Sequence, residues 1–158
     1  MASEASLRPM RADEYATSIA ATKAGYAHDI EVSGGYPRST ALQRSEEDIA
    51  RILPDGLETA GQLFFVIEHE GRSVGRLWLA ERTSGTLRTL FIYEIEVDDA
   101  HRGKGLGRAA MLLAEEEATA RGITRIELNV FGGNEVARGL YRSLGYVESA
   151  VQMAKNLT

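Results

Sequence analysis

The chain has 158 residues, which fits one domain, and its 44% hydrophobic and 26% charged residues are ordinary for a globular protein. The net charge of −5 argues against general binding to nucleic acids or anionic membranes, because such binding needs a basic face. The lack of cysteine excludes disulfides and a thiol nucleophile, and no apolar run is long enough for a membrane span. With no secretory signal at the N-terminus, we expect a cytoplasmic protein.

The first half of the chain predicts three elements before its pattern changes. They are a strand at residues 7–10, a helix at 13–30 and a second helix that begins at 39 or 40 and ends at 52. Asp13 is placed to cap the first helix, and the glycines at 34 and 35 end it. Pro54 stops the second helix.

From residue 62 onward the sequence predicts mainly strands, with two further helices. These elements are strands at 63–67, 74–80 and 87–97, a helix at 106–120, a strand at 124–130, a helix at 134–144 and a weak last strand at 151–155. The polar residues 68–72 predict a hairpin, so the first three of these strands form an antiparallel meander. No linker interrupts the order. We therefore expect a single mixed α/β domain over residues 1–158.

A glycine-rich turn lies between the strand that ends near Val97 and the helix that begins near Leu106. Glycines at 103, 105 and 107 let a ligand approach the backbone, and the first amides of the helix have no partners within it. Such a helix start binds phosphate well. Three basic residues, Arg102, Lys104 and Arg108, accompany the glycines. Acidic residues stand just upstream, at Glu94, Glu96, Asp98 and Asp99.

Two nucleotide-binding motifs offer other interpretations of this turn. The P-loop string G-x-x-x-x-G-K-[ST] does not occur. The string from Gly105 through Gly107 to Ala110 formally matches the alanine variant of the dinucleotide fingerprint, but the meander upstream is not a βαβ unit. A turn that binds no ligand also remains open.

The string Arg102-x-x-Gly105-x-Gly107 resembles the acyl-CoA pyrophosphate loop of the GNAT superfamily of N-acyltransferases. Residues 91–97 are similar to that family's splayed central strand, and the order of elements is also the family's. The resemblance implies a mostly antiparallel mixed sheet of about six to seven strands with about four helices, splayed between the fourth and fifth strands. It also implies that the strand end pairs with the pantetheine arm of acetyl-CoA and that the loop binds the pyrophosphate. The implied cofactor-binding residues are Val97, Arg102, Gly103, Lys104, Gly105, Leu106, Gly107 and Arg108.

A second motif lies near the C-terminus. The pattern Asn-x-x-Ala-x-x-Leu-Tyr-x-x-x-Gly-Tyr, which begins at Asn134, resembles the family's other cofactor-binding stretch and implies that Asn134, Ala137 and Tyr141 contact the cofactor. These three residues share one helix face with Arg138. Another face is expected to join the core and carries Val136, Leu140 and Leu144. Asn134 is placed to cap this helix, which is compatible with contact to the cofactor but also explains the residue without it. A core position is the alternative for Tyr141.

Attack by an amine on a thioester requires loss of the ammonium proton, so a base is expected. Glu94 and Glu96 are two residues apart and are expected on one face of their strand, with Tyr93, Ile95 and Val97 on the other. Either carboxylate is a candidate base, with Asp98 as a third choice, and a pair of solvent-facing carboxylates is the alternative. By the resemblance, Tyr141 would protonate the departing thiolate or donate a hydrogen bond to it.

The sequence therefore predicts an N-acetyltransferase that moves the acetyl group of acetyl-CoA directly to a primary amine in a ternary complex. A coenzyme A-binding module without turnover and a dinucleotide oxidoreductase are the alternatives. The three histidines lack ligand spacing, so no metal is expected. The acceptor is a small-molecule or peptide amine, chosen by residues near 26–36 and 83–89, and the acidic strand favours a cationic one. A homodimer remains open, and no nucleic acid or membrane partner is expected.

Overall fold

The computed structural model describes residues 4–158, and the chain divides into two compact units, Met1–Leu128 and Asn129–Thr158. These units are groups of residues in contact with one another, and the division does not test whether residues 1–158 form a single domain. The single domain therefore stays a prediction. Within the described part of the chain, no helix combines the length and the apolar composition that a membrane span requires.

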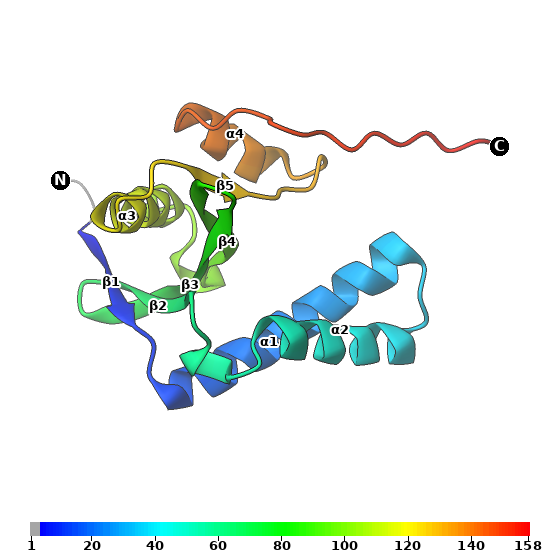
Figure 1. Cartoon of the computed structure of the whole chain (residues 1–158), viewed down its shortest axis with the longest axis horizontal. Helices are drawn as coiled ribbons and strands as arrows, with labels where there is room; N and C mark the ends of the chain where they lie inside the picture. The colour runs from blue at the N-terminus through cyan, green and yellow to red at the C-terminus, as the bar shows by residue number, and fades with distance from the viewer. Residues whose placement is uncertain (1–3) are drawn as a thin grey trace. The chain divides into compact units, whose positions relative to one another are not determined.

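Five strands of the first unit form one sheet in the order β1-β2-β3-β4-β5 (Figure 1). Their bounds are β1 Ala5–Pro9, β2 Gln62–His69, β3 Arg72–Ser84, β4 Leu87–Val97 and β5 Ile126–Leu128. Strands β1 to β4 pair antiparallel and β5 pairs parallel with β4, so the predicted meander and the mixed sheet are confirmed. This antiparallel arrangement is not the βαβ unit that the dinucleotide interpretation of the glycine turn requires.

The number of strands differs from the prediction at the C-terminus. The described residues supply five strands rather than about six to seven, and residues 151–155 have no regular secondary structure. A strand needs a hydrogen-bonded neighbour, and this segment pairs with no strand of the described sheet. Its apolar side chains Val151 and Met153 are 64% and 89% exposed. The expected last strand is therefore wrong.

Four helices and two short 3-10 helices complete the described elements. Their bounds are α1 Ala12–Gly34, α2 Arg38–Ile52, η1 Gly56–Glu58, η2 Asp99–His101, α3 Leu106–Ala120 and α4 Glu135–Ser143. The predicted cap at Asp13 is wrong, because the carboxylate of Glu14 accepts the backbone amide of Arg11 at 2.9 Å just before α1 begins. The helix continues to Gly34, past the predicted end at residue 30, but the predicted stop at the glycines is confirmed by Gly35, whose φ of 66° lies in the left-handed region.

Helices α1 and α2 lie on one side of the sheet, and α3 lies on the other (Figure 1). The core under α1 and α2 contains a row of aromatic side chains. Phe64 of β2 stacks on Trp78 of β3 with ring centroids 5.2 Å apart, and Trp78 stacks on Tyr93 of β4 at 4.3 Å. Each ring removes a large apolar area from water, so the row fixes β2, β3 and β4 against α1 and α2.

A β-bulge interrupts the pairing of β3 with β4 beside this aromatic row. Trp78 pairs with Glu94, but its neighbour Leu79 pairs with Ile92, so Tyr93 is an extra residue in β4. Because of this extra residue, Tyr93 stacks on Trp78 while Glu94 stands opposite Trp78 on the same face. The prediction that Tyr93 lies on the face opposite to Glu94 is therefore wrong, since strict alternation holds only without a bulge.

The second unit contains α4 and the residues around it. Asn134 caps this helix, because its side-chain oxygen accepts the backbone amide of Ala137 at 3.2 Å, as predicted. Arg138 donates to the carbonyl of Gly132 at 2.8 Å and pairs with Glu148, which fixes the loop before the helix and the segment after it. Val136 is 89% exposed, so its expected place in the core is wrong.

Candidate acyl-CoA site

The glycine-rich turn follows β4 and leads into α3 through η2. Gly103 and Gly105 have φ values of 77° and 76°, which place both in the left-handed region where other residues are strained. Gly105 is the N-cap of α3, so Leu106 and Gly107 are its first two residues. Their amides have no carbonyl four residues earlier within the helix. The backbone conformation therefore turns the predicted loop into a helix start that suits an anionic group.

The side chain of Arg102 is folded back onto the end of β4. It pairs with Glu96 at 2.8 Å and with Asp99 at 2.9 Å, and its Nε donates to the carbonyl of Val97 at 3.0 Å. Three predicted site residues, Glu96, Val97 and Arg102, therefore lie together. The basic and acidic residues that are neighbours in the sequence therefore pair with one another at Arg102, whose side chain neutralises the acidic residues beside it.

The carboxylate of Glu94 is held by two groups that the motifs did not single out. Its Oε1 accepts a hydrogen bond from Arg76 Nε of β3 at 2.7 Å and one from Thr22 Oγ1 of α1 at 2.8 Å. The side chain of Glu94 is 22% exposed, compared with 40% for Glu96. Thus Glu94 is fixed in orientation between the sheet and α1, whereas Glu96 is closer to solvent.

Strand β4 extends beyond its parallel partner. β5 pairs with β4 only from Leu90 to Ile92, but β4 continues to Val97 with β3 on its other side. The residues from the bulge to Val97 therefore present a strand edge that β5 does not cover. Such an edge offers amides and carbonyls to an extended ligand. This is the place where the resemblance expects the fourth and fifth strands to splay.

Gly75 of β3 determines how closely β3 approaches that strand end. An added Cβ at this position would lie 2.1 Å from the carbonyl oxygen of Glu96 and 3.1 Å from Val97 Cα. Only glycine fits this spacing, which keeps the residues around Val97 paired with β3. Sequence reasoning missed Gly75, although a glycine inside a strand is a signal of close backbone approach.

Three further predicted residues lie on α4 or at its start in the second unit. Asn134 is the N-cap, Ala137 is half-buried one turn later, and Tyr141 lies a further turn along the helix. The ring of Tyr141 is tilted against that of Tyr146, with centroids 6.0 Å apart. Burial raises the pKa of Tyr141 above its ordinary value. Its hydroxyl therefore stays protonated over the whole neutral range and keeps its hydrogen-bond donor.

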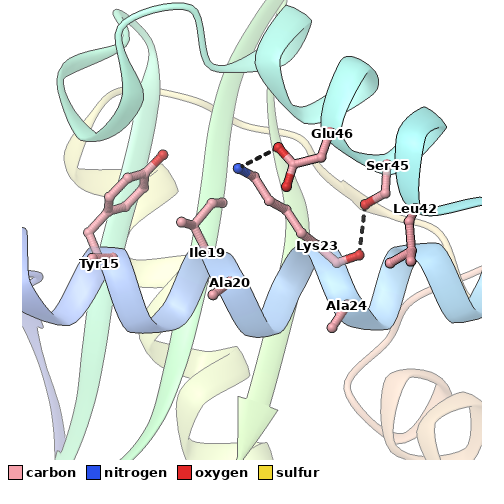
Figure 2. Close-up of a pocket in the computed structure, with 9 residues that line it drawn as sticks. Tyr15, Ile19, Ala20, Lys23, Ala24, Leu42, Ser45 and Glu46 are labelled. Atoms are coloured by element: carbon pink, nitrogen blue, oxygen red, sulfur yellow. Dashed lines mark hydrogen bonds and ion pairs between the residues drawn. The ribbon is translucent and has the colours of Figure 1, made fainter. Parts of the chain in front are cut away.

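A groove between α1 and α2 lies apart from these residues. It has a volume of about 550 Å³, and none of its lining residues belongs to the predicted site. Lys23 of α1 pairs with Glu46 of α2 at 3.0 Å, and Ser45 donates to the Lys23 carbonyl at 2.7 Å (Figure 2). These contacts hold the two helices together, so the residues that line the groove serve the packing of α1 against α2.

Comparison with known proteins agrees with the fold. The profile of the Acetyltransferase (GNAT) family matches residues 25–146. The chain belongs to the GNAT acetyltransferase family. As a GNAT protein it is an acyltransferase, which confirms the enzyme class predicted from the two motifs.

Two relatives of this GNAT protein cover nearly its whole length. The uncharacterized N-acetyltransferases YycN and YdgE of Bacillus subtilis are each 30% identical over 152 residues, which is 96% of this chain and 97% of theirs. The crystal structure of YycN matches with a TM-score of 0.89, covering 98% of this chain and 99% of that chain. An acetyl transferase from Pyrococcus furiosus matches with a TM-score of 0.68 at 28% identity, covering 98% and 100%.

Proposed function

We propose that this GNAT protein transfers the acetyl group of acetyl-CoA to a primary amine by direct attack in a ternary complex. The observation that carries the proposal is the arrangement at the end of β4. There, an uncovered strand edge, a half-buried carboxylate and a glycine-rich helix start follow one another within residues 93–107. An extended thioester donor with an anionic end matches this order of groups.

The residues at the end of β4 fit coenzyme A in two respects. Gly103 and Gly105 leave open space where side chains would stand, so the backbone amides at the start of α3 are accessible to a pyrophosphate. The edge of β4 near Val97 offers backbone groups to the amide-containing pantetheine arm. Lys104 and Arg108 add positive charge to this end, whereas the charge of Arg102 is paired with Glu96 and Asp99. In the proposal Asn134, Ala137 and Tyr141 complete the cofactor contacts from α4.

Glu94 is proposed as the base that removes the amine proton, and Glu96 as the second candidate. Deprotonation of an alkyl ammonium with a pKa of about 10.4 costs about 5 kcal/mol of free energy at pH 7. A carboxylate positioned to accept this proton therefore favours the reaction. The bonds from Arg76 and Thr22 both end on Glu94 Oε1. Oε2 is left to take the proton directly or through one water.

Tyr141 is proposed to stabilise the leaving thiolate. When the amine nitrogen attacks the carbonyl carbon, the carbon–sulfur bond breaks and negative charge develops on sulfur. A thiol has a pKa of about 8.5 and tyrosine has one of about 10 before burial, so full transfer of the Tyr141 proton is uphill. Burial raises the pKa of Tyr141 further. A hydrogen bond that strengthens as charge develops is therefore the proposed role.

The proposal keeps the cytoplasmic location and the amine acceptor expected from the sequence. It requires no nucleic acid, membrane or metal, and it is independent of whether the protein is a homodimer. One expectation is changed by the contacts of the site. Glu94 is neutralised by Arg76 and Glu96 by Arg102, so the acidic strand alone gives no reason to favour a cationic acceptor.

The experiment is an incubation of the purified protein with acetyl-CoA and a panel of primary amines, with free thiol measured over time. Release of thiol that depends on an amine supports the proposal. Glu94→Gln should lower the rate, whereas Glu47→Gln, an exposed carboxylate on α2, serves as the matched control. Binding of coenzyme A without thiol release for any amine would instead support a binding module without turnover.

A further inference from the structure

Arg82 of β3 lies on the same face of the sheet as the proposed base. Its guanidinium carbon is 3.7 Å from the ring centroid of Phe91 and 5.0 Å from that of Tyr93. One guanidinium nitrogen also donates to the Tyr93 hydroxyl at 2.8 Å. The two rings therefore fix the position of a positive charge at the edge of the aromatic row that contains Trp78 and Tyr93.

The charge of Arg82 is not neutralised by the protein. Across the part of the chain that the structure describes, no carboxylate forms an ion pair with Arg82, although Arg76 and Arg88 in the same pair of strands each have one. Arg82 is exposed to solvent. A guanidinium has five N–H donors, and the one that bonds Tyr93 leaves others available in a planar arrangement that matches a carboxylate.

The position of Arg82 relative to Glu94 follows from the strand register. The guanidinium lies over Phe91 and reaches Tyr93, and Glu94 is the next residue of β4. Glu94 lies three residue steps after Phe91, which corresponds to about 10 Å along β4. Because the bulge places Tyr93 and Glu94 on one face, a molecule lying beside the half-buried Tyr93 can reach both the carboxylate of Glu94 and the guanidinium of Arg82.

We propose that Arg82 binds a carboxylate of the acceptor, so that the acceptor is a primary amine with a carboxylate at the other end of an intervening chain. This inference rests on the proposed function, because it assigns the acceptor class of the same site. Glu94 would lie at the amine end and Arg82 at the carboxylate end, with Tyr93 beside the chain between them. Arg82 is thus a specificity-determining residue.

The test compares two acceptors of equal chain length, ε-aminocaproate and hexylamine, at saturating acetyl-CoA. A hydrogen-bonded ion pair of this kind should give ε-aminocaproate a kcat/KM advantage of about tenfold or more, mainly through KM. Arg82→Gln should abolish the advantage, so that the ratio of the two kcat/KM values falls to about 1, and Arg82→Lys should restore part of it. Arg88→Gln removes an exposed arginine paired with Glu81 on the neighbouring strand and should keep the full advantage.

Equal kcat/KM values for the two acceptors in the wild-type protein would overturn the inference while leaving the proposed function intact. An advantage that persists in Arg82→Gln would overturn it as well. Absence of turnover with any amine would instead contradict the proposed function. In that case calorimetric titration of ε-aminocaproate into the coenzyme A-loaded protein still decides the role of Arg82. Binding that Arg82→Gln abolishes supports the carboxylate site, and no binding to the wild-type protein overturns it.

Discussion

Replacement of Gly75 by alanine tests how closely β3 must approach the end of β4. The added methyl group would lie 2.1 Å from the carbonyl oxygen of Glu96, whereas a real Cβ does not come within 3.0 Å of such an atom. The neighbouring atoms belong to the backbone of Glu96 and Val97, so no side chain can rotate away to relieve the clash. The two strands must therefore move apart by about 1 Å, as in an overpacked core.

A movement of this size affects both stability and the proposed cofactor edge. The amide of Asp98 donates to the carbonyl of Val74 at 2.8 Å, and an extra separation of about 1 Å would break this bond. We expect Gly75→Ala to lower the free energy of unfolding by about 1–3 kcal/mol. Because Val97 would shift with its strand, we also expect the KM for acetyl-CoA to rise about tenfold, equivalent to about 1.4 kcal/mol.

The assay is urea unfolding together with the acetyl-CoA dependence of thiol release at a fixed amine concentration. Gly25→Ala is the matched control, because Gly25 lies inside α1 with no atom within 4 Å of an added Cβ. This control should stabilise the protein by about 0.5–1 kcal/mol and leave the KM unchanged. An unchanged urea midpoint and an unchanged KM in Gly75→Ala would refute the reasoning on the strand spacing.

Four further predictions concern the glycine turn, the two proposed catalytic residues and the start of α1. Gly105→Ala should cost about 1–2 kcal/mol of stability, because its φ is 76°, and should raise the acetyl-CoA KM; a KM equal to that of the wild-type protein would contradict the loop assignment. Glu94→Gln should lower kcat by a factor of about 10²–10⁴ with little change in coenzyme A binding, measured by steady-state kinetics and calorimetry. Tyr141→Phe should lower kcat by the same factor at pH 7 and pH 9, because burial raises the pKa of Tyr141 and keeps the hydroxyl protonated; a ratio that falls between these pH values would argue against this role. Hydrogen bonds from Arg8 and from a backbone amide lower the pKa of Glu14 to about 2 from 4.5. The stabilisation from Glu14 should therefore be complete above pH 4.5 and disappear as the pH falls toward 2, so the urea midpoints of Glu14→Gln and wild type should converge over that range.

Features set by local sequence were predictable. The polar residues between β2 and β3 form the expected hairpin, where Glu70 and Gly71 both have positive φ. The glycine turn and the cap at Asn134 were also found, because each depends on a few neighbouring residues. Such short-range signals identify the start of a helix or the end of a strand whatever the rest of the fold.

Features that depend on partners distant in sequence could not be predicted. The bulge at Tyr93 arises from the pairing of two strands, so alternation within β4 alone gave the wrong face. The contacts of Glu94 come from Arg76 on another strand and from Thr22 on a helix 72 residues away. The prediction of a last strand was wrong for the same reason. Alternating apolar residues such as Val151 and Met153 form a strand only where a neighbouring strand is available for pairing.

The central claim is that acetyl transfer to an amine occurs at the end of β4. The most direct measurement is mass-spectrometric detection of the N-acetylated amine, with thiol release followed in parallel, for the wild-type protein and for Glu94→Gln. We predict one acetylated amine for each thiol released by the wild-type protein and a rate lower by a factor of about 10²–10⁴ in the variant. Coenzyme A binding with no acetylated product from any amine would contradict the claim.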